Sequence, residues 1–468
     1  MKQIKWIKLL ILSLGFIFGS WDRGQALLAQ SPVLQDYILQ GLESNQGLKQ
    51  KKLDYASSLA ALKASRGLFF PDISFNARFT VAQGGRQIEF PVGDLLNPVY
   101  STLNLLTASD AFPNIENESF PFLRPVEQET KMSLVQPIFS SDIIQNHRIN
   151  EQQVALSKID VDHFTHQLVK EISKAYYGFQ KASNLVGLAD TTLNLVNENL
   201  RVSRRLFEND KVTIDAVYRS ESELSKVEVQ RAQAVNMFEA SRAYFNFLLN
   251  RDLNSPILMD SVSPEPVLIS LEDASLIALA NRTELEQINE YQQLNKHLTN
   301  LYRGKNKPGL FGVIDYGIQG EDYSIRGEDD FVMASLVMQW NLFQGSSNRH
   351  KVQESKIKGE KLEVLMDETR QQIRLDVINQ YYALKAAFES VRSANKQTIS
   401  ATRAYELINR RFREGQSSLL ELIDARTSLT GASANAIIAR SEYFIRKAEF
   451  EHARGLNHTE YLLQNQNR

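Results

Sequence analysis

The sequence predicts a mostly helical, internally duplicated fold with a small β part: long antiparallel coiled-coil hairpins and four strands per chain. A seam of apolar residues runs at alternating steps of four and three, including Leu168, Ile172 and Ala175. This 3.5-residue spacing is typical of coiled coils. The seam recurs 205 residues downstream, where Ile373 and Val377 stand in the positions of Leu168 and Ile172. A copy this distant indicates duplication of a large unit rather than a short solenoid repeat.

Composition excludes several classes of function. The chain has 468 residues, a formal net charge of −2 and no cysteine. The nearly balanced charge gives no reason to expect a nucleic-acid partner. The lack of cysteine excludes disulfides, thiolate metal sites, cysteine nucleophiles and a lipid-modified N-terminal cysteine.

The N-terminus is typical of a secretory signal peptide, which we assign to residues 1–29. Lysines precede a short apolar run from Leu9 to Phe18, and small residues follow it. Cleavage after Ala26 and cleavage after Ala29 both fit this pattern. A membrane anchor is the alternative, but the run is shorter than the ~20 apolar residues that a spanning helix needs.

The remainder, residues 30–468, divides into two repeats at about 31–255 and about 265–468. Each has the order short helix, strand, loop, strand and long helical hairpin. Residues 84–128 are rich in Pro, Asn, Gly and Ser without a clear period, so we expect a long loop there. The other expected elements are a helix over 31–66, strands over about 72–83 and 129–138, a hairpin over about 141–250, a shorter helical pair over about 271–303, strands over about 311–320 and 330–342, and a hairpin over about 346–454.

The strands have one apolar and one polar face. Ile73, Phe75 and Phe79 alternate with polar residues, as in a strand with two different environments. Membrane barrels need at least eight strands, so several chains would have to share one barrel. A small soluble sheet is the alternative. Aromatic residues near the strand ends fit a membrane-interface girdle or the core of such a sheet: Phe69, Phe70, Phe139, Trp340 and Phe343.

Three segments resemble the TolC-type family of outer-membrane efflux proteins. Residues 136–139 (Gln-Pro-Ile-Phe) and 339–345 (Gln-Trp-Asn-Leu-Phe-Gln-Gly) resemble the paired strand-to-helix junctions of that family. Residues 412–425 resemble its periplasmic turn, and the first-repeat counterpart at 207–217 is more degenerate. With the duplication and the strand placement, the resemblance covers essentially the whole mature length.

The resemblance implies an outer-membrane channel with a large periplasmic part. Three chains would form a twelve-stranded transmembrane β-barrel, embedded in outer-membrane lipid, over a periplasmic α-barrel. Such a homotrimer is the passive exit duct of a tripartite efflux or type I secretion system, coupled through a periplasmic adaptor (membrane fusion) protein to an inner-membrane transporter. A secreted periplasmic coiled-coil scaffold or adaptor that does not span the membrane is the alternative.

We expect no enzymatic activity, no cofactor and no metal ion. The sequence shows no nucleophile–base set, phosphate loop or paired catalytic carboxylates. His163 and His166 share a predicted helix face, but no third ligand accompanies them, which favours surface histidines.

The candidate channel entrance lies next to the second-repeat turn. Glu421 and Asp424 are three residues apart on the predicted helix after Gly415, so they share a face. In a symmetric oligomer each becomes a ring of acids, and acidic rings select cations. By resemblance the two match the family's acidic constriction, with glutamate replacing aspartate at 421. Asp215 is the approximate counterpart of Glu421 in the first repeat. A solvated helix face with a capping role is the alternative.

The resemblance also makes the two hairpin turns the expected adaptor contacts. The tyrosine and arginine that often latch the family's entrance are replaced here by Phe412 and Ser417, so we do not expect closure by the same hydrogen bonds and salt bridges. In the first repeat, Asn209 stands about where Gly415 stands. The expected contact residues are Asn209, Asp210, Lys211, Val212, Gly415, Gln416, Ser417 and Ser418.

Overall fold

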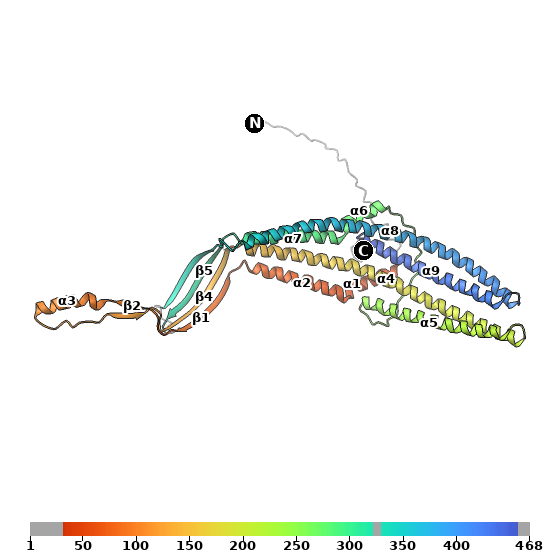
Figure 1. The fold of residues 1–468 in the computed structure, drawn as a ribbon, viewed down its shortest axis with the longest axis horizontal. Coiled ribbons are helices and arrows are strands. Elements are labelled where there is room, and N and C mark those ends of the chain that lie inside the picture. The colour runs from red at the N-terminus through yellow and green to blue at the C-terminus, as the bar shows by residue number, and fades with distance from the viewer. Residues whose placement is uncertain (1–30, 322–328, 457–468) are drawn as a thin grey trace, which may run out of the picture. The chain divides into compact units, whose positions relative to one another are not determined.

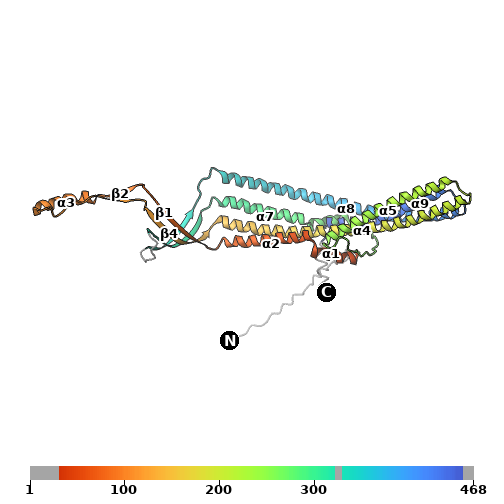
Figure 2. The same cartoon turned by 90° about the horizontal axis from the view of Figure 1, so that it is seen from below.

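The computed structural model describes residues 31–321 and 329–456 (Figures 1 and 2). The predicted signal peptide and both candidate cleavage positions lie outside these residues. The described chain divides into two units. The hairpin unit contains residues up to 50, 161–283 and from 369 onward, and the sheet unit contains residues 51–160 and 284–368.

The helices carry the expected duplication. The two longest have 68 and 67 residues, and each is followed by a helix of 35 residues. A pair of shorter helices precedes the strands of each repeat, so the predicted class of long helical hairpins is confirmed. The helices are α1 (Pro32–Ser44), α2 (Gln46–Gly67), α4 (Ser141–Glu208), α5 (Ile214–Leu248), α6 (Leu271–Asn281), α7 (Thr283–Gly304), α8 (Ser347–Arg413) and α9 (Leu419–Ala453).

The repeated seam is buried within the hairpin unit. Leu168 and Ile172 on α4 are buried, and so are their counterparts Ile373 and Val377 on α8. Alanines at other seam positions, such as Ala182, are buried as well. Because small side chains at a helix contact reduce the distance between helix axes, the alanines let neighbouring helices lie close together.

No helix among the described residues has a stretch that is both long and apolar enough to cross a membrane.

The short helix pairs contact the end of the second long helix of their own repeat. At the corner between α1 and α2, the Asn45 side-chain amide donates to the carbonyl of Leu248, at 2.8 Å. At the corner between α6 and α7, Arg282 Nη1 donates to the carbonyl of Ala453, at 3.2 Å. Leu248 and Ala453 are 205 residues apart, so both corners satisfy the same orphan helix-terminal carbonyl.

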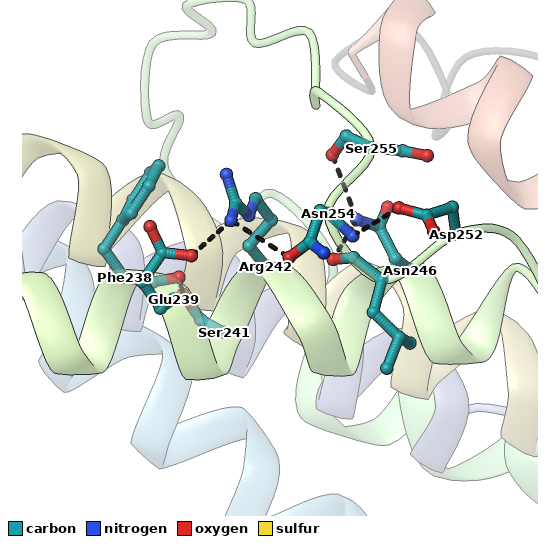
Figure 3. A network of polar contacts seen from close by, with 9 residues as sticks. Phe238, Glu239, Ser241, Arg242, Asn246, Asp252, Asn254 and Ser255 are labelled. Atoms are coloured by element: carbon teal, nitrogen blue, oxygen red, sulfur yellow. Dashed lines mark hydrogen bonds and ion pairs between the residues drawn. The ribbon is translucent and has the colours of Figure 1, made fainter.

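A polar network connects the end of α5 to the segment that leads into the second repeat (Figure 3). Asn246 is fully buried, and its Nδ2 donates to the carbonyls of Leu253 (2.8 Å) and Ser255 (3.0 Å). Its Oδ1 accepts from Arg251 Nε at 2.6 Å. A buried amide needs partners for both its donors and its acceptor, so Asn246 holds the chain in this reversal.

Four antiparallel strands form one sheet in the sheet unit, in the order β1-β4-β5-β6. The register aligns Phe75, Met132, Tyr316 and Val332 in one row across the sheet. The adjacent row contains Ser74, Ser133 and Asp315 on the opposite face, so the predicted apolar and polar faces are both present. The strands are β1 (Asp72–Val81), β4 (Val126–Phe139), β5 (Gly309–Gly320) and β6 (Asp330–Gln339).

The long loop predicted over residues 84–128 is wrong. That segment contains β2 (Gln87–Phe90), α3 (Val92–Thr107), β3 (Glu118–Pro121) and the start of β4. Here asparagine side-chain amides form hydrogen bonds with the backbone of the returning chain. Asn97 Nδ2 donates to the carbonyl of Ile115 at 2.9 Å, and Asn104 Nδ2 donates to the carbonyl of Phe112 at 2.7 Å. Because these bonds tie the helix to the returning chain, the segment is ordered despite its loop-like composition.

Candidate functional site

The turn between α8 and α9 is a left-handed helix cap. Gly415 has a φ of 74°, and its amide donates to the carbonyl of Phe412 at 3.0 Å. The amide of Gln416 donates to the carbonyl of Arg411 at 2.8 Å. These two bonds define a Schellman motif, in which a residue with positive φ satisfies the last helix carbonyls. Glycine adopts this conformation without steric cost, which explains its place at this turn.

The turn between α4 and α5 has the same geometry with a different residue at its centre. Asp210 has a φ of 56°, its amide donates to Phe207, and the Lys211 amide donates to Leu206. Asp210, rather than Asn209, therefore stands in the position of Gly415. The Asn209 side chain instead donates to the carbonyl of Arg205, at 2.7 Å.

The corrected register also shifts the first-repeat acid. Ala216 aligns with Glu421, and Asp215 lies one position earlier, in the first turn of α5. The hydroxyl of Thr213 donates to Asp215, and Arg219 Nε lies 3.5 Å from the same carboxylate. Asp215 is therefore engaged in local contacts at the start of its helix.

Glu421 closes a capping box at the start of α9. The Glu421 amide donates to Ser418 Oγ at 3.2 Å, and the Ser418 amide donates to Glu421 Oε2 at 3.1 Å. The hydroxyl of Ser417 donates to the same carboxylate oxygen. Hydrogen bonds from Ser417 and Ser418, with the nearby Arg411 guanidinium, hold the pKa of the Glu421 carboxyl below its usual range. The capping role considered from the sequence is thus present.

Asp424 differs from the other two acids. It is exposed one turn further along α9, and within the described residues its carboxylate makes no hydrogen bond or ion pair. Among the candidate entrance acids, Asp424 is the one whose charge no described residue of this chain engages.

Phe412 lies in an apolar cluster behind the turn. Phe412, Tyr405 and Leu422 are buried together, with Leu206 of α4 among the side chains packed against them. The latch position therefore holds a core residue that joins α8 to α9 and α4. Its first-repeat counterpart, Phe207, is 40% exposed.

A buried ion pair that the sequence analysis missed joins the two hairpins. Arg426 of α9 is 4% exposed, and its Nη2 lies 2.6 Å from Glu223 Oε2 of α5. Its Nε and Nη1 have no hydrogen-bond partner within the described chain. Burial raises the pKa of Glu223, but hydrogen bonds from Lys226 and Arg426 outweigh it and lower that pKa overall. The available signal was an arginine at a seam position, four residues after Leu422.

The apolar face of the sheet is exposed across all four strands. Phe75, Met132, Tyr316 and Val332 are each more than half exposed. A contiguous apolar surface of this kind marks contact with lipid or with another protein. On the opposite face, Glu129 lies 3.1 Å from Arg78.

The predicted interface aromatics lie at one end of this sheet. The register pairs Asp72 with Val135 and Gly309 with Gln339, so β1 and β5 begin where β4 and β6 end. The side chains there are exposed, and Trp340 Nε1 donates to the carbonyl of Asn306 at 3.0 Å. The aromatic residues concerned are Phe69, Phe70, Phe139, Trp340 and Phe343.

Comparison with known proteins agrees with this architecture. The family model described as Outer membrane efflux protein matches residues 276–455, which span the second repeat. The second repeat is therefore similar to the outer membrane efflux protein family. No curated protein matches the chain by sequence.

Solved structures of outer-membrane channels share the fold of this chain. The Campylobacter jejuni CmeC outer membrane channel has a TM-score of 0.76 at 15% identity, with 93% of this chain and 89% of that chain covered. The Vibrio cholerae outer membrane protein VceC has a TM-score of 0.72 at 11% identity, with 90% and 96% covered. The open-state Neisseria gonorrhoeae MtrE channel has a TM-score of 0.68 at 17% identity, with 91% and 89% covered.

The match of the second repeat to this family and the shared fold together indicate an outer-membrane location, with a large periplasmic part. The matched family consists of channels that act as passive conduits rather than enzymes.

Proposed function

We propose that three copies of the chain form the exit duct of a tripartite efflux or type I secretion system. The observation that carries this proposal is the four-stranded sheet, which exposes an apolar face and has β1 and β6 as its outer strands. Unpaired strand edges in a membrane leave backbone groups unsatisfied, so β1 of one copy would pair with β6 of the next. Three sheets of four strands would close one barrel, in which the repeats 31–255 and 265–468 contribute alike.

The hairpin ends would form the periplasmic entrance. In a symmetric trimer Asp424 becomes a ring of three carboxylates, and such a ring favours cations. Glu421 and Asp215 would add to the same negative field, although both carboxylates also make local contacts. Asp424 is the strongest candidate because no side chain of its own chain neutralises it within the described residues.

The two turns would be the contacts for a periplasmic adaptor protein, which in turn binds an inner-membrane transporter. Residues 209–212 and 415–418 present the same cap geometry at both hairpin ends, so one adaptor motif could recognise both repeats. The exposed aromatics at the sheet end, such as Trp340 and Phe343, would lie at the membrane interface. The transporter would supply the energy, since the duct has none of its own.

The first test is the native mass of the protein extracted from membranes, with and without detergent. The proposal expects a detergent-dependent species of three chains. A monomer or dimer that needs no detergent would exclude the channel and leave a periplasmic coiled-coil scaffold.

The second test is ion selectivity in planar bilayers. Asp424→Asn should lower the permeability of cations relative to anions. Glu414→Gln, which removes an exposed carboxylate on the turn itself, is the matched control and should have a smaller effect. Equal selectivity in the wild type and in Asp424→Asn would exclude Asp424 from the constriction.

A further inference from the structure

An arm extends from the sheet between β1 and β4. This arm, residues 82–125, consists of the paired strands β2 and β3 with α3 at its far end. Figures 1 and 2 show α3 and β2 beyond the ends of β1 and β4, on the side of the sheet away from α2 and α7. The arm therefore begins at the sheet end opposite the predicted interface aromatics.

The inner face of α3 is occupied by its own chain. Besides the bonds that Asn97 and Asn104 donate, each side chain accepts from the return segment, from the amides of Ile115 (2.9 Å) and Phe112 (3.0 Å). A Cβ atom on Gly93 would lie 2.5 Å from the carbonyl oxygen of Ile115, so glycine is required for this close approach. These contacts determine which face of α3 the return segment covers.

About a quarter-turn around α3 from this inner face lies an apolar stripe with coiled-coil spacing. The stripe occurs at steps of four, three, four and three. Val99 and Leu106 on it are 51% and 76% exposed, and Val92 and Leu103 are half-buried. Leu95 and Leu105, which are 70% and 84% exposed, lie beside the stripe. This period is typical of a helix that packs along another helix. The stripe residues are Val92, Leu96, Val99, Leu103 and Leu106.

The charge of the helix argues against a lipid surface as the partner. Helices that lie on membranes usually present Lys or Arg on their polar face. α3 has one charged side chain, Asp94, and no basic residue. An apolar stripe that no basic residue borders is better suited to packing against another apolar helix face.

We propose that the apolar stripe of α3 packs against the same stripe on the other copies of this chain, so that the arms form a helical cluster at the outer end of the barrel. This inference rests on the oligomeric channel proposed above. β1, from which the arm starts, is an outer strand of the sheet and would face another copy in a closed barrel, so each arm leaves from a junction between copies. A 16-residue helix is marginal by itself, but tethering to a shared barrel raises the effective concentration to the mM range.

The native chain has no cysteine, so a single introduced cysteine has no partner within its own chain, and a disulfide-linked dimer of twice the chain mass reports contact with another copy. Val99→Cys in the full-length protein, oxidised in native membranes, should give a disulfide-linked dimer on a denaturing gel. Ser101→Cys is the matched control, because it is exposed on the same helix but lies about 200° around it from Val99. Disulfides need Cα atoms within about 7 Å, so Ser101→Cys should give little dimer.

A cysteine scan sharpens the test. Cross-linking should peak at positions 96, 99, 103 and 106, and Val99→Glu should reduce the dimer formed by Leu106→Cys. A detergent-extracted species of three chains without cross-linking at 99, or with equal cross-linking at 99 and 101, would overturn the stripe contact while leaving the channel intact. Flotation with lipopolysaccharide vesicles that is lost in Val99→Glu, without dimer formation, would assign the stripe to a lipid surface. A detergent-extracted species of one chain would contradict both the trimeric channel and the contact between stripes.

Discussion

The buried pair Arg426–Glu223 makes the sharpest prediction about how the two hairpins hold together. Glu223→Gln removes the carboxylate that pairs with Arg426 at 2.6 Å, the only one to do so among residues 31–321 and 329–456, and leaves the guanidinium 4% exposed. Arg426 cannot lose its proton to escape the cost, because arginine stays charged in proteins. Its Nε and Nη1 already lack partners within the described chain, so the remaining charge has no compensation there.

Removing one partner of a buried ion pair costs about 3–5 kcal/mol. If this loss falls on the local opening of α5 and α9, amide exchange there should accelerate by roughly 10²- to 4 × 10³-fold, since each ~1.4 kcal/mol is a factor of ten. Native-state hydrogen exchange of the amides near Val227 and Leu422 reads this directly. It does not require reversible unfolding of the whole membrane protein.

Three variants serve as controls. Lys226→Met removes the other cation on Glu223, at 2.7 Å, but Lys226 is 65% exposed and its pair should contribute at most about 1 kcal/mol. Arg426→Met leaves Glu223 with Lys226 as a partner, at 2.7 Å, so we expect a smaller loss of stability than in Glu223→Gln. The double variant Glu223→Gln/Arg426→Met should then be more stable than Glu223→Gln alone. Equal exchange in Glu223→Gln and Lys226→Met, or no recovery in the double variant, would refute this reasoning.

Three other predictions concern the turn and the sheet. Phe412→Ala should destabilise the hairpin end by about 3–5 kcal/mol because it leaves a cavity at a buried site. The same change at the exposed counterpart, Phe207→Ala, should destabilise it by about 0.5 kcal/mol. Thermal unfolding of the two variants tests this, and equal shifts of their unfolding temperatures would contradict it. Because the folded-state pKa of Glu421 is lowered, the stability that its cap contributes is fully present above the ordinary value of 4.5 and is lost as pH falls through the lowered pKa. Hydrogen exchange of the Leu422 amide, corrected for its intrinsic rate, should therefore rise over that pH range in the wild type but not in Glu421→Gln. Parallel pH profiles in the two proteins would argue against the cap. Val332→Arg should lower the stability of the folded protein in the membrane by about 2–4 kcal/mol if the apolar face meets lipid, and should reduce the amount of folded oligomer. Met333→Arg, on the opposite face beside Asp315, should still assemble. Assembly of Val332→Arg but not of Met333→Arg would show that the two faces are assigned wrongly.

Most of the fold could be predicted from the periodicity of apolar residues along the sequence. A seam at 3.5 residues and alternation at 2 residues are local consequences of helix and strand geometry, so they were readable from the chain itself. The same holds for the duplication, because an offset of 205 residues relates Ile172 to Val377 without reference to a partner. The loop expectation for residues 84–128 failed because Asn97 and Asn104 bind distant backbone groups, and no period records such bonds.

The sequence by itself determined that this protein is a duplicated set of long hairpins with a two-faced sheet, because these features depend on which residues recur along one element. Only the tertiary structure decided that Glu421 caps its own helix and that Arg426 pairs with Glu223. The physical reason is that a side chain's partner depends on how separate helices and turns meet in space. Two residues 203 positions apart become a buried ion pair only once both hairpins are packed.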